Sequence, residues 1–132
     1  MATFGAPVST AQDTVNAFTA VQVIVNTLQQ KIQNREIQPV KIGVGMYAGN
    51  VIAGNVGSQK RRQYSVNGNP VIMASRLEQL NKLHNSTLIM SRSLFESLPN
   101  HNEFRPTFLW TEIKGLENRI EVAIFTEQNL LV

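Results

Sequence analysis

The sequence of 132 residues contains no cysteine, which excludes disulfide bonds and thiolate metal sites. It contains one aspartate, Asp13, and the rest of its nine acidic residues are glutamates. Chemistry that needs two aspartates on a divalent metal ion is therefore excluded for this chain alone. The sequence also lacks a signal-peptide pattern and any apolar run long enough to cross a bilayer. With no cysteine, we expect a cytoplasmic protein without a membrane segment.

The charges are nearly balanced. Twelve Lys and Arg against nine Asp and Glu give a net charge of +3, which permits an anionic partner without requiring one. The length and the apolar fraction of 42% suffice for one domain with its own core. We therefore assign residues 1–132 to a single domain.

Hydrophobic periodicity predicts strands and helices in succession. Predicted strands lie at 1–5, 40–47, 51–56, 63–66, 87–90, 104–113 and 119–125. Predicted helices run from a Ser9 or Thr10 cap to Ile32, from an Asn69 cap with the core stripe Val71, Ala74, Leu77 and Leu80, and over 91–98. The sum is an α+β fold, a ferredoxin-like, antiparallel-rich sheet with helices on one face, followed by a frayed tail.

The stretch from Lys41 to Glu78 is rich in glycine and contains a basic loop at 57–63 with Lys60, Arg61 and Arg62. Glycines along strands let a backbone or a ligand come close. Together with a hydroxyl at Ser65 and an inward Arg76, the loop is a candidate anion site. The alternative interpretation is turn glycines, a solvated basic loop and a surface ion pair of Arg76.

Three segments resemble one known family, in the family's order: MATFGAP, VKIGVGMYAGNVIAGNVGSQKRRQYSVNGNPVIMASRLEQLNK and LWTEIKGLENRIEVAIF. They resemble the second half of the class III nucleotidyl cyclase catalytic domain, the domain of adenylate and guanylate cyclases. The resemblance implies that two domains pair head to tail and share sites in which two aspartates hold two Mg²⁺ or Mn²⁺ ions on a nucleoside triphosphate. The ribose 3′-oxygen then attacks the α-phosphorus, which gives a cyclic 3′,5′-monophosphate and pyrophosphate.

The resemblance carries roles onto three positions. Arg76 matches the transition-state arginine, and Ile72 matches the asparagine four residues before it. Isoleucine has no hydrogen-bonding group, so Ile72 cannot hold the ribose oxygen. Ser65 matches the position that selects the base, and its hydroxyl favours adenine only mildly over guanine. Lys114-Gly115 matches the family's closing turn, for which we expect a structural role.

The family's first strand and both metal-binding aspartates would precede Met1, and Asp13 is interpreted as a complement to a helix dipole. We therefore expect a truncated and partly degenerate cyclase domain, inactive alone, that self-associates or is a piece of a longer protein. It is expected to bind ATP or GTP weakly or only in a heterodimer.

Two other functions follow from the same residues. The first is a pseudo-cyclase dimerisation or regulatory module that pairs with a complete cyclase and lends it Arg76. The second is nucleic-acid binding through the basic loop, which we set aside because the strands lack interleaved aromatic residues. The one tryptophan, Trp110, is interpreted as a packing residue.

Overall fold

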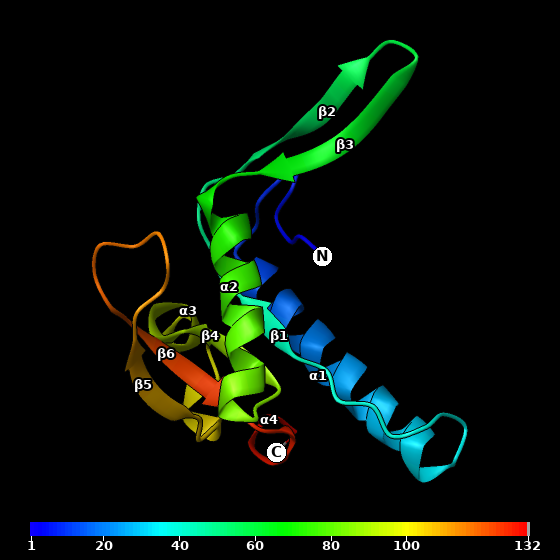
Figure 1. Cartoon of the computed structure of the whole chain (residues 1–132), viewed down its shortest axis with the longest axis vertical. Coiled ribbons are helices and arrows are strands. Elements are labelled where there is room, and N and C mark those ends of the chain that lie inside the picture. The colour runs from blue at the N-terminus through cyan, green and yellow to red at the C-terminus, as the bar shows by residue number, and fades with distance from the viewer. Residues whose placement is uncertain (132) are drawn as a thin grey trace.

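The structure is a computed structural model that describes residues 1–131, without the side chains of Val56, Arg62 and Gln63. Figure 1 shows a small body with one long hairpin projecting from it. The helices are α1 (Asp13–Gln33), α2 (Asn69–His84), α3 (Arg92–Glu96) and α4 (Glu127–Leu130), with a 3₁₀ turn at His101–Glu103. The strands are β1 (Val44–Met46), β2 (Ile52–Ser58), β3 (Arg61–Asn67), β4 (Leu88–Ser91), β5 (Thr107–Thr111) and β6 (Ile120–Phe125).

Four strands form one sheet in the order β1-β4-β6-β5. β1 pairs with β4 in parallel, and the other two pairings are antiparallel. This arrangement confirms the α+β class and the antiparallel-rich sheet. Among the described residues, no helix has both the length and the apolar character needed to cross a membrane.

Helices cover both faces of this sheet, whereas the sequence predicted them on one face. On one face, Leu88 and Met90 of β4 pack with α1 and α3. On the other face, Ile89 packs with Met73 and Leu77 of α2. Every residue of β4 is buried, so its alternating side chains need an apolar layer on each side.

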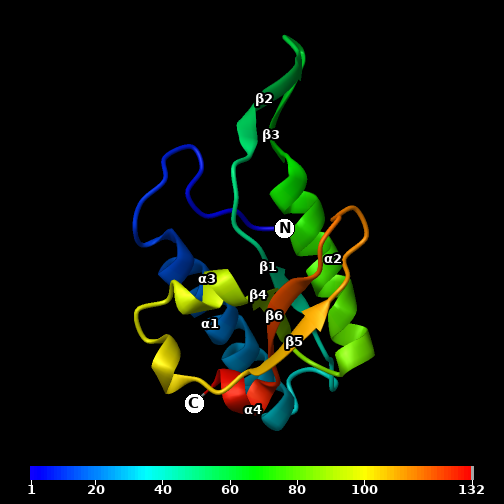
Figure 2. The same cartoon turned by 90° about the vertical axis from the view of Figure 1, so that its left-hand side faces the viewer.

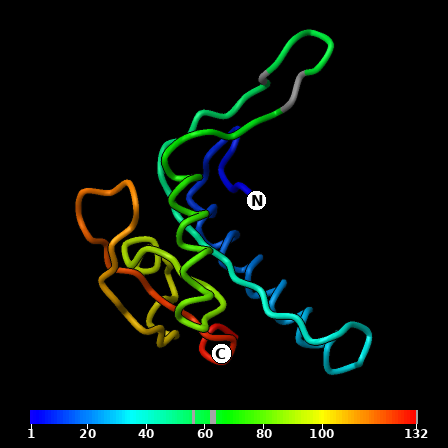
Figure 3. Tube along the Cα trace, viewed as in Figure 1, coloured from blue at the N-terminus to red at the C-terminus, as the bar shows by residue number. Residues whose placement is uncertain are grey.

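β2 and β3 form a separate two-stranded sheet that projects beyond the N-terminal end of α2; we call it the β2–β3 arm (Figures 1, 2 and 3). The basic loop predicted at 57–63 is wrong, because Ser58 pairs with Arg61 and only Gln59 and Lys60 remain in the turn. Gln59-Lys60 is not the Asn-Gly or Asp-Gly pair that marks two-residue turns. The side chain of Arg62, which was assigned to that loop, lies outside the described residues.

Several predicted boundaries were also wrong. Residues 1–5 form no strand, because none of the described strands pairs with them and an extended segment needs such a partner. The strand predicted at 40–47 shrinks to Val44–Met46, which pairs with Leu88–Met90 of β4. Residues 126–131 of the predicted tail are not frayed: Leu130 is fully buried, and Gln22 Nε2 donates to its carbonyl oxygen at 3.0 Å.

Candidate functional site

Helix α2 carries two of the three predicted site residues. It begins at Asn69, with Pro70 in the first turn, and its N-cap is Gly68 rather than the predicted Asn69. Ile72 and Arg76 are four residues apart, so they lie one turn apart on the same side of the helix. Ile72 is 48% exposed, and Arg76 is half-buried. An isoleucine this exposed presents an apolar surface where the resemblance implies an amide.

The position of α2 is set by close contact with β1, which we call the β1–α2 seam (Gly43, Gly45 and Asn81). A Cβ on Gly45 would overlap the carbonyl oxygen of Ala74 and the amide nitrogen of Glu78. A Cβ on Gly43 would lie 2.9 Å from the Cβ of Asn81. Glycine therefore lets the strand touch the helix backbone, as the sequence predicted for this stretch.

Asn81 is a buried polar residue of the seam that the predicted core stripe missed. Its Nδ2 donates to the carbonyl oxygens of Val44 at 2.9 Å and Glu78 at 3.0 Å. Its Oδ1 accepts a hydrogen bond from Ser86 Oγ at 2.8 Å. Because every polar atom of this amide is paired, Asn81 ties strand and helix together without leaving a buried group unsatisfied. Apolar periodicity cannot detect such a residue.

Ser65, the third predicted site residue, lies on β3 in the β2–β3 arm. Its hydroxyl accepts a hydrogen bond from Asn67 Nδ2 at 3.0 Å and is half-buried. Directly across the ladder is Gly54, where an added Cβ would find nothing within 4 Å. The hydroxyl therefore sits beside open space. No hydrogen bond joins Ser65 to Arg76 among the described residues, so the structure connects them through the chain from β3 into α2.

Arg76 lies against the loop between β5 and β6, which Figures 1 and 2 show beside the N-terminal half of α2. A Cβ on Gly115 would overlap its Nη1 and lie 3.4 Å from its Cζ. The predicted surface ion pair of Arg76 is not found among the described residues. Its guanidinium is thus held beside a glycine rather than neutralised by a carboxylate. The closing turn at Lys114-Gly115 therefore lies at the site.

Asp13 lies in the first turn of α1, as predicted. Its carboxylate accepts hydrogen bonds from the Thr10 amide (2.8 Å), Ser9 Oγ (3.0 Å) and Thr10 Oγ1 (3.0 Å). These bonds, the backbone one foremost, lower the pKa of Asp13 below its ordinary value of 3.8. The predicted Ser9 or Thr10 cap is wrong, because Gln12 is the N-cap of α1. The Asp13 carboxylate instead accepts hydrogen bonds from residues that precede the helix.

The acidic residues do not fit the divalent metal ions that the resemblance implies. Both carboxylate oxygens of Asp13 are occupied by local donors. Within residues 1–131, no three His, Asp or Glu side chains gather as a metal-binding group. Oxygen-rich cation sites need several such ligands together.

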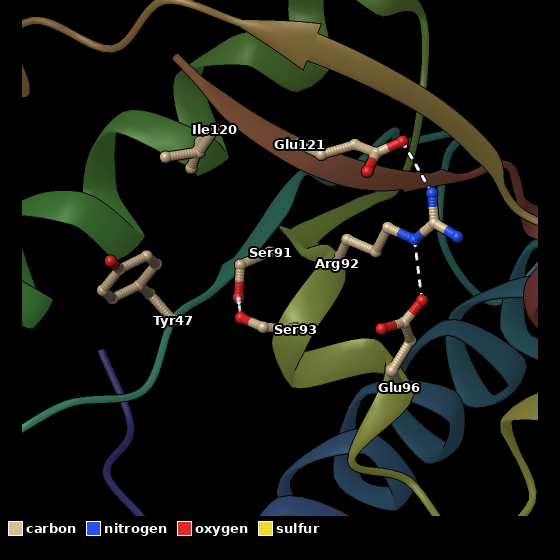
Figure 4. A pocket seen from close by; sticks show the side chains of 7 residues that line it. All are labelled: Tyr47, Ser91, Arg92, Ser93, Glu96, Ile120 and Glu121. Atoms are coloured by element: carbon tan, nitrogen blue, oxygen red, sulfur yellow. Dashed lines mark hydrogen bonds and ion pairs between the residues drawn. The ribbon is translucent and has the colours of Figure 1, made fainter. Parts of the chain in front are cut away.

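A hollow of about 570 Å³ lies elsewhere, between β1, α3 and β6 (Figure 4). Arg92 dominates it and donates to Glu96 and to Glu121, both at 2.7 Å, while its guanidinium lies 4.4 Å from the Phe108 ring centre. These carboxylates, Glu96 first, raise the pKa of Arg92 above its ordinary value. The charge of Arg92 is therefore already balanced by two carboxylates. Neither Ile72 nor Arg76 lines the hollow.

The remaining predicted residues lie on the surface. Lys60 and Arg61 are exposed at the tip of the β2–β3 arm. Trp110 is 61% exposed on β5, so its predicted packing role is wrong for the structure described. The reason is that β5 is an edge strand whose first four residues are all exposed.

Comparison with known proteins shows which family this chain matches. Residues 1–123 match the family described as adenylate and guanylate cyclase catalytic domain. Uncharacterised proteins of Mycobacterium bovis and Mycobacterium tuberculosis are 37% identical over 91 residues, which is 69% of this chain and 16% of each relative. The chain thus spans about one sixth of the length of these curated relatives.

Solved structures match over most of the chain. The guanylyl cyclase Cya2 is 26% identical with a TM-score of 0.70, over 92% of this chain and 61% of that one. The adenylyl cyclase CyaB from P. aeruginosa is 22% identical with a TM-score of 0.67, over 92% of this chain and 63% of the other. The second likeness concerns the fold alone.

Proposed function

Because this chain belongs to the adenylate and guanylate cyclase catalytic domain family, we propose that it forms the arginine-bearing side of a composite cyclase site. Such a site converts a nucleoside triphosphate into a cyclic 3′,5′-monophosphate and pyrophosphate. The observation that carries the proposal is Arg76, whose guanidinium lies beside Gly115 and is not paired with a carboxylate among the described residues. A guanidinium that no carboxylate neutralises is suited to charge that develops on a phosphoryl group.

The neighbouring positions define what this side of the site offers. Ser65 supplies a hydroxyl beside the open space at Gly54, which suits the edge of a purine base and favours ATP only mildly. Ile72 supplies no donor or acceptor for the ribose. This side therefore contributes charge and base contacts, and the ribose has to be oriented by other groups.

The 132-residue chain alone is not expected to turn over ATP or GTP with Mg²⁺ or Mn²⁺. Its single aspartate is held by Ser9 and Thr10, and two copies would bring two arginines but no aspartate pair. A homodimer would thus be unproductive. The productive partner is a complete cyclase domain that holds the metal ions and accepts Arg76 across the interface. The projecting β2–β3 arm provides a surface that can reach such a domain (Figure 1).

The test is a complementation assay. The chain is mixed with a complete class III cyclase domain whose own transition-state arginine has been replaced by alanine, and cyclic nucleotide is measured with ATP and with GTP. We expect activity from the mixture only. Arg76→Ala should lower it by about 10²- to 10³-fold, as the loss of one transition-state donor does.

Lys82→Ala is the matched control, because it removes a cation from the exposed far end of the same helix. It should leave the activity unchanged. Ile72→Asn should not make the isolated chain active, since the metal ions would still have no ligands. Turnover by the isolated chain, or equal activity of Arg76→Ala and the unmodified chain, would refute the proposal.

The alternative is a regulatory module that pairs with a complete cyclase without lending a residue. The exposed Ile72 favours it, because an apolar side chain at this position suits packing better than catalysis. The same assay separates the two functions. A regulator would change the activity of an intact cyclase domain and would do so equally with Arg76→Ala.

A further inference from the structure

The loop that faces Arg76 is built around a turn that only glycine closes easily. Leu116 N donates to the carbonyl oxygen of Ile113 at 3.0 Å, which closes a four-residue turn. Gly115 is its third residue and has φ +95°, a conformation that residues with a side chain rarely adopt. The backbone of Gly115 is therefore fixed by the turn itself.

This turn is anchored to the sheet and to α2 by its apolar side chains. Ile113 is 5% exposed and belongs to the same apolar cluster as Met73 and Leu77 of α2. Leu116 packs against this cluster from the other end of the turn. Gly115 thus stands at a set place relative to the helix that carries Arg76.

The bare Cα of Gly115 leaves the space that the Arg76 guanidinium occupies. An added Cβ would overlap Nη1 and approach Cζ to 3.4 Å and Nη2 to 3.7 Å. All three atoms belong to the far end of one long, flexible side chain. Such a side chain can swing away at small cost, so a Cβ would move the guanidinium rather than force the helix and loop apart.

We propose that Gly115 is a positioning residue: its missing side chain decides where the guanidinium of Arg76 lies. This inference rests on the proposed function of Arg76 for its catalytic consequence, but not for the positioning itself. A mutation far from the chemistry that misplaces a catalytic group by about 1 Å can reduce a rate by about 10²-fold. The closing turn therefore acts on catalysis through Arg76, without touching the substrate.

The positioning is tested by NMR of arginine Nε–Hε signals in the 132-residue chain. The Arg76 signal is assigned by its loss in Arg76→Ala. In Gly115→Ala we expect it to shift, while the signal of Arg92, which is locked to Glu96, stays in place. Gly5→Ala is the matched control, because Gly5 has φ +90° and its added Cβ would meet Asp13 instead. It should leave the Arg76 signal unchanged.

The catalytic consequence is tested in the complementation assay. Gly115→Ala should lower turnover by about ten- to a hundredfold while KM for the nucleotide changes less than about twofold. An unmoved Arg76 signal in folded Gly115→Ala overturns the positioning. A shifted signal with unchanged turnover overturns the catalytic consequence. If the unmodified chain gives no complementation, the proposed function fails, and the NMR result still decides the positioning.

A double-mutant cycle covers the case of poor folding. Gly115→Ala should lower the urea midpoint less in the Arg76→Ala background than in the unmodified chain, since the overlapping group is then gone. If Gly115→Ala unfolds the chain in both backgrounds, the glycine is needed by the turn alone, and the proposal is wrong.

Discussion

The glycine-rich stretch builds two regions with opposite properties, the β1–α2 seam and the β2–β3 arm. In the seam, Gly43 and Gly45 have no room for a side chain. In the arm, an added Cβ on Gly54 would meet nothing within 4 Å. Glycines in the same stretch of sequence therefore have different roles. Gly43 and Gly45 let a strand contact a helix, and Gly54 leaves the surface of the arm open.

The same contrast divides the candidate site. Arg76 stands on a helix that the seam fixes to a buried sheet, and Ser65 stands on an arm whose two strands form a separate sheet. We infer that the helix carrying the proposed charge-stabilising group is held in place, while the position of the proposed base-contacting group depends on what the arm touches. Four substitutions test how far this contrast holds.

Gly45→Ala should destabilise the fold most. Its Cβ would overlap the backbone of Ala74 and Glu78, which cannot move without displacing α2. We expect a loss of about 3 kcal/mol in the free energy of unfolding, the upper range for overpacking. Urea denaturation monitored by circular dichroism measures it. A loss below about 1 kcal/mol would show that the seam can open without cost.

Asn81→Ala should come next, with a loss of about 2 kcal/mol, because the carbonyl oxygen of Val44 and the hydroxyl of Ser86 lose a partner. The same urea titration applies. Asn16→Ala, at an exposed position of α1, is the control for loss of an amide and should cost less. Equal losses in the two variants would contradict the role of Asn81 in the seam.

Gly54→Ala should change the free energy of unfolding by no more than about 0.5 kcal/mol, since the new methyl group meets open space and alanine is no worse in a strand. Hydrogen exchange gives the accompanying test. Amides of β2 and β3 should exchange faster than those of β4 and β6, which lie in the buried sheet. Equal protection would mean that the arm is as firmly held as the seam.

Asp13→Asn should have the smallest effect, and one that depends on pH. The pKa of Asp13 is lowered in the folded chain, so its stabilisation is fully present above the ordinary value of 3.8 and is lost as pH falls through the folded value. The unmodified chain should be the more stable at pH 7, and the two urea midpoints should converge at a strongly acidic pH, where the carboxyl group of Asp13 is protonated in the folded chain as well. A gap of equal size at both pH values would contradict this cause.

The sequence predicted the succession of strands and helices because periodicity reports which residues face a core. The lengths of the strands were harder to predict: β1 covers only Val44–Met46, because its extent depends on its pairing with β4. The turn at Gln59 and Lys60 was missed because its residues carry no turn signal, and α4 because its burial depends on contacts with α1.

For the candidate site, family resemblance pointed to Ser65, Ile72 and Arg76, whose roles stay predictions, and the structure added what surrounds them. The spacing of Ile72 and Arg76 was enough to place them on one helix face. The approach of Gly115 to Arg76 was not predictable, because it joins a loop and a helix that are far apart in the chain. Asn81 was missed because a buried amide breaks the apolar pattern that identifies a helix face.

The length of the β2–β3 arm sets the distance between its tip and its base. Each of its strands has seven residues, and at about 3.4 Å per residue its tip stands about 24 Å beyond its base. Adding two residues to each strand would move the tip outward by about 7 Å and keep every side chain on its face. Adding one to each would turn the tip over, because successive side chains alternate between faces. The reach of the arm can therefore change only in paired steps without inverting the surface it presents.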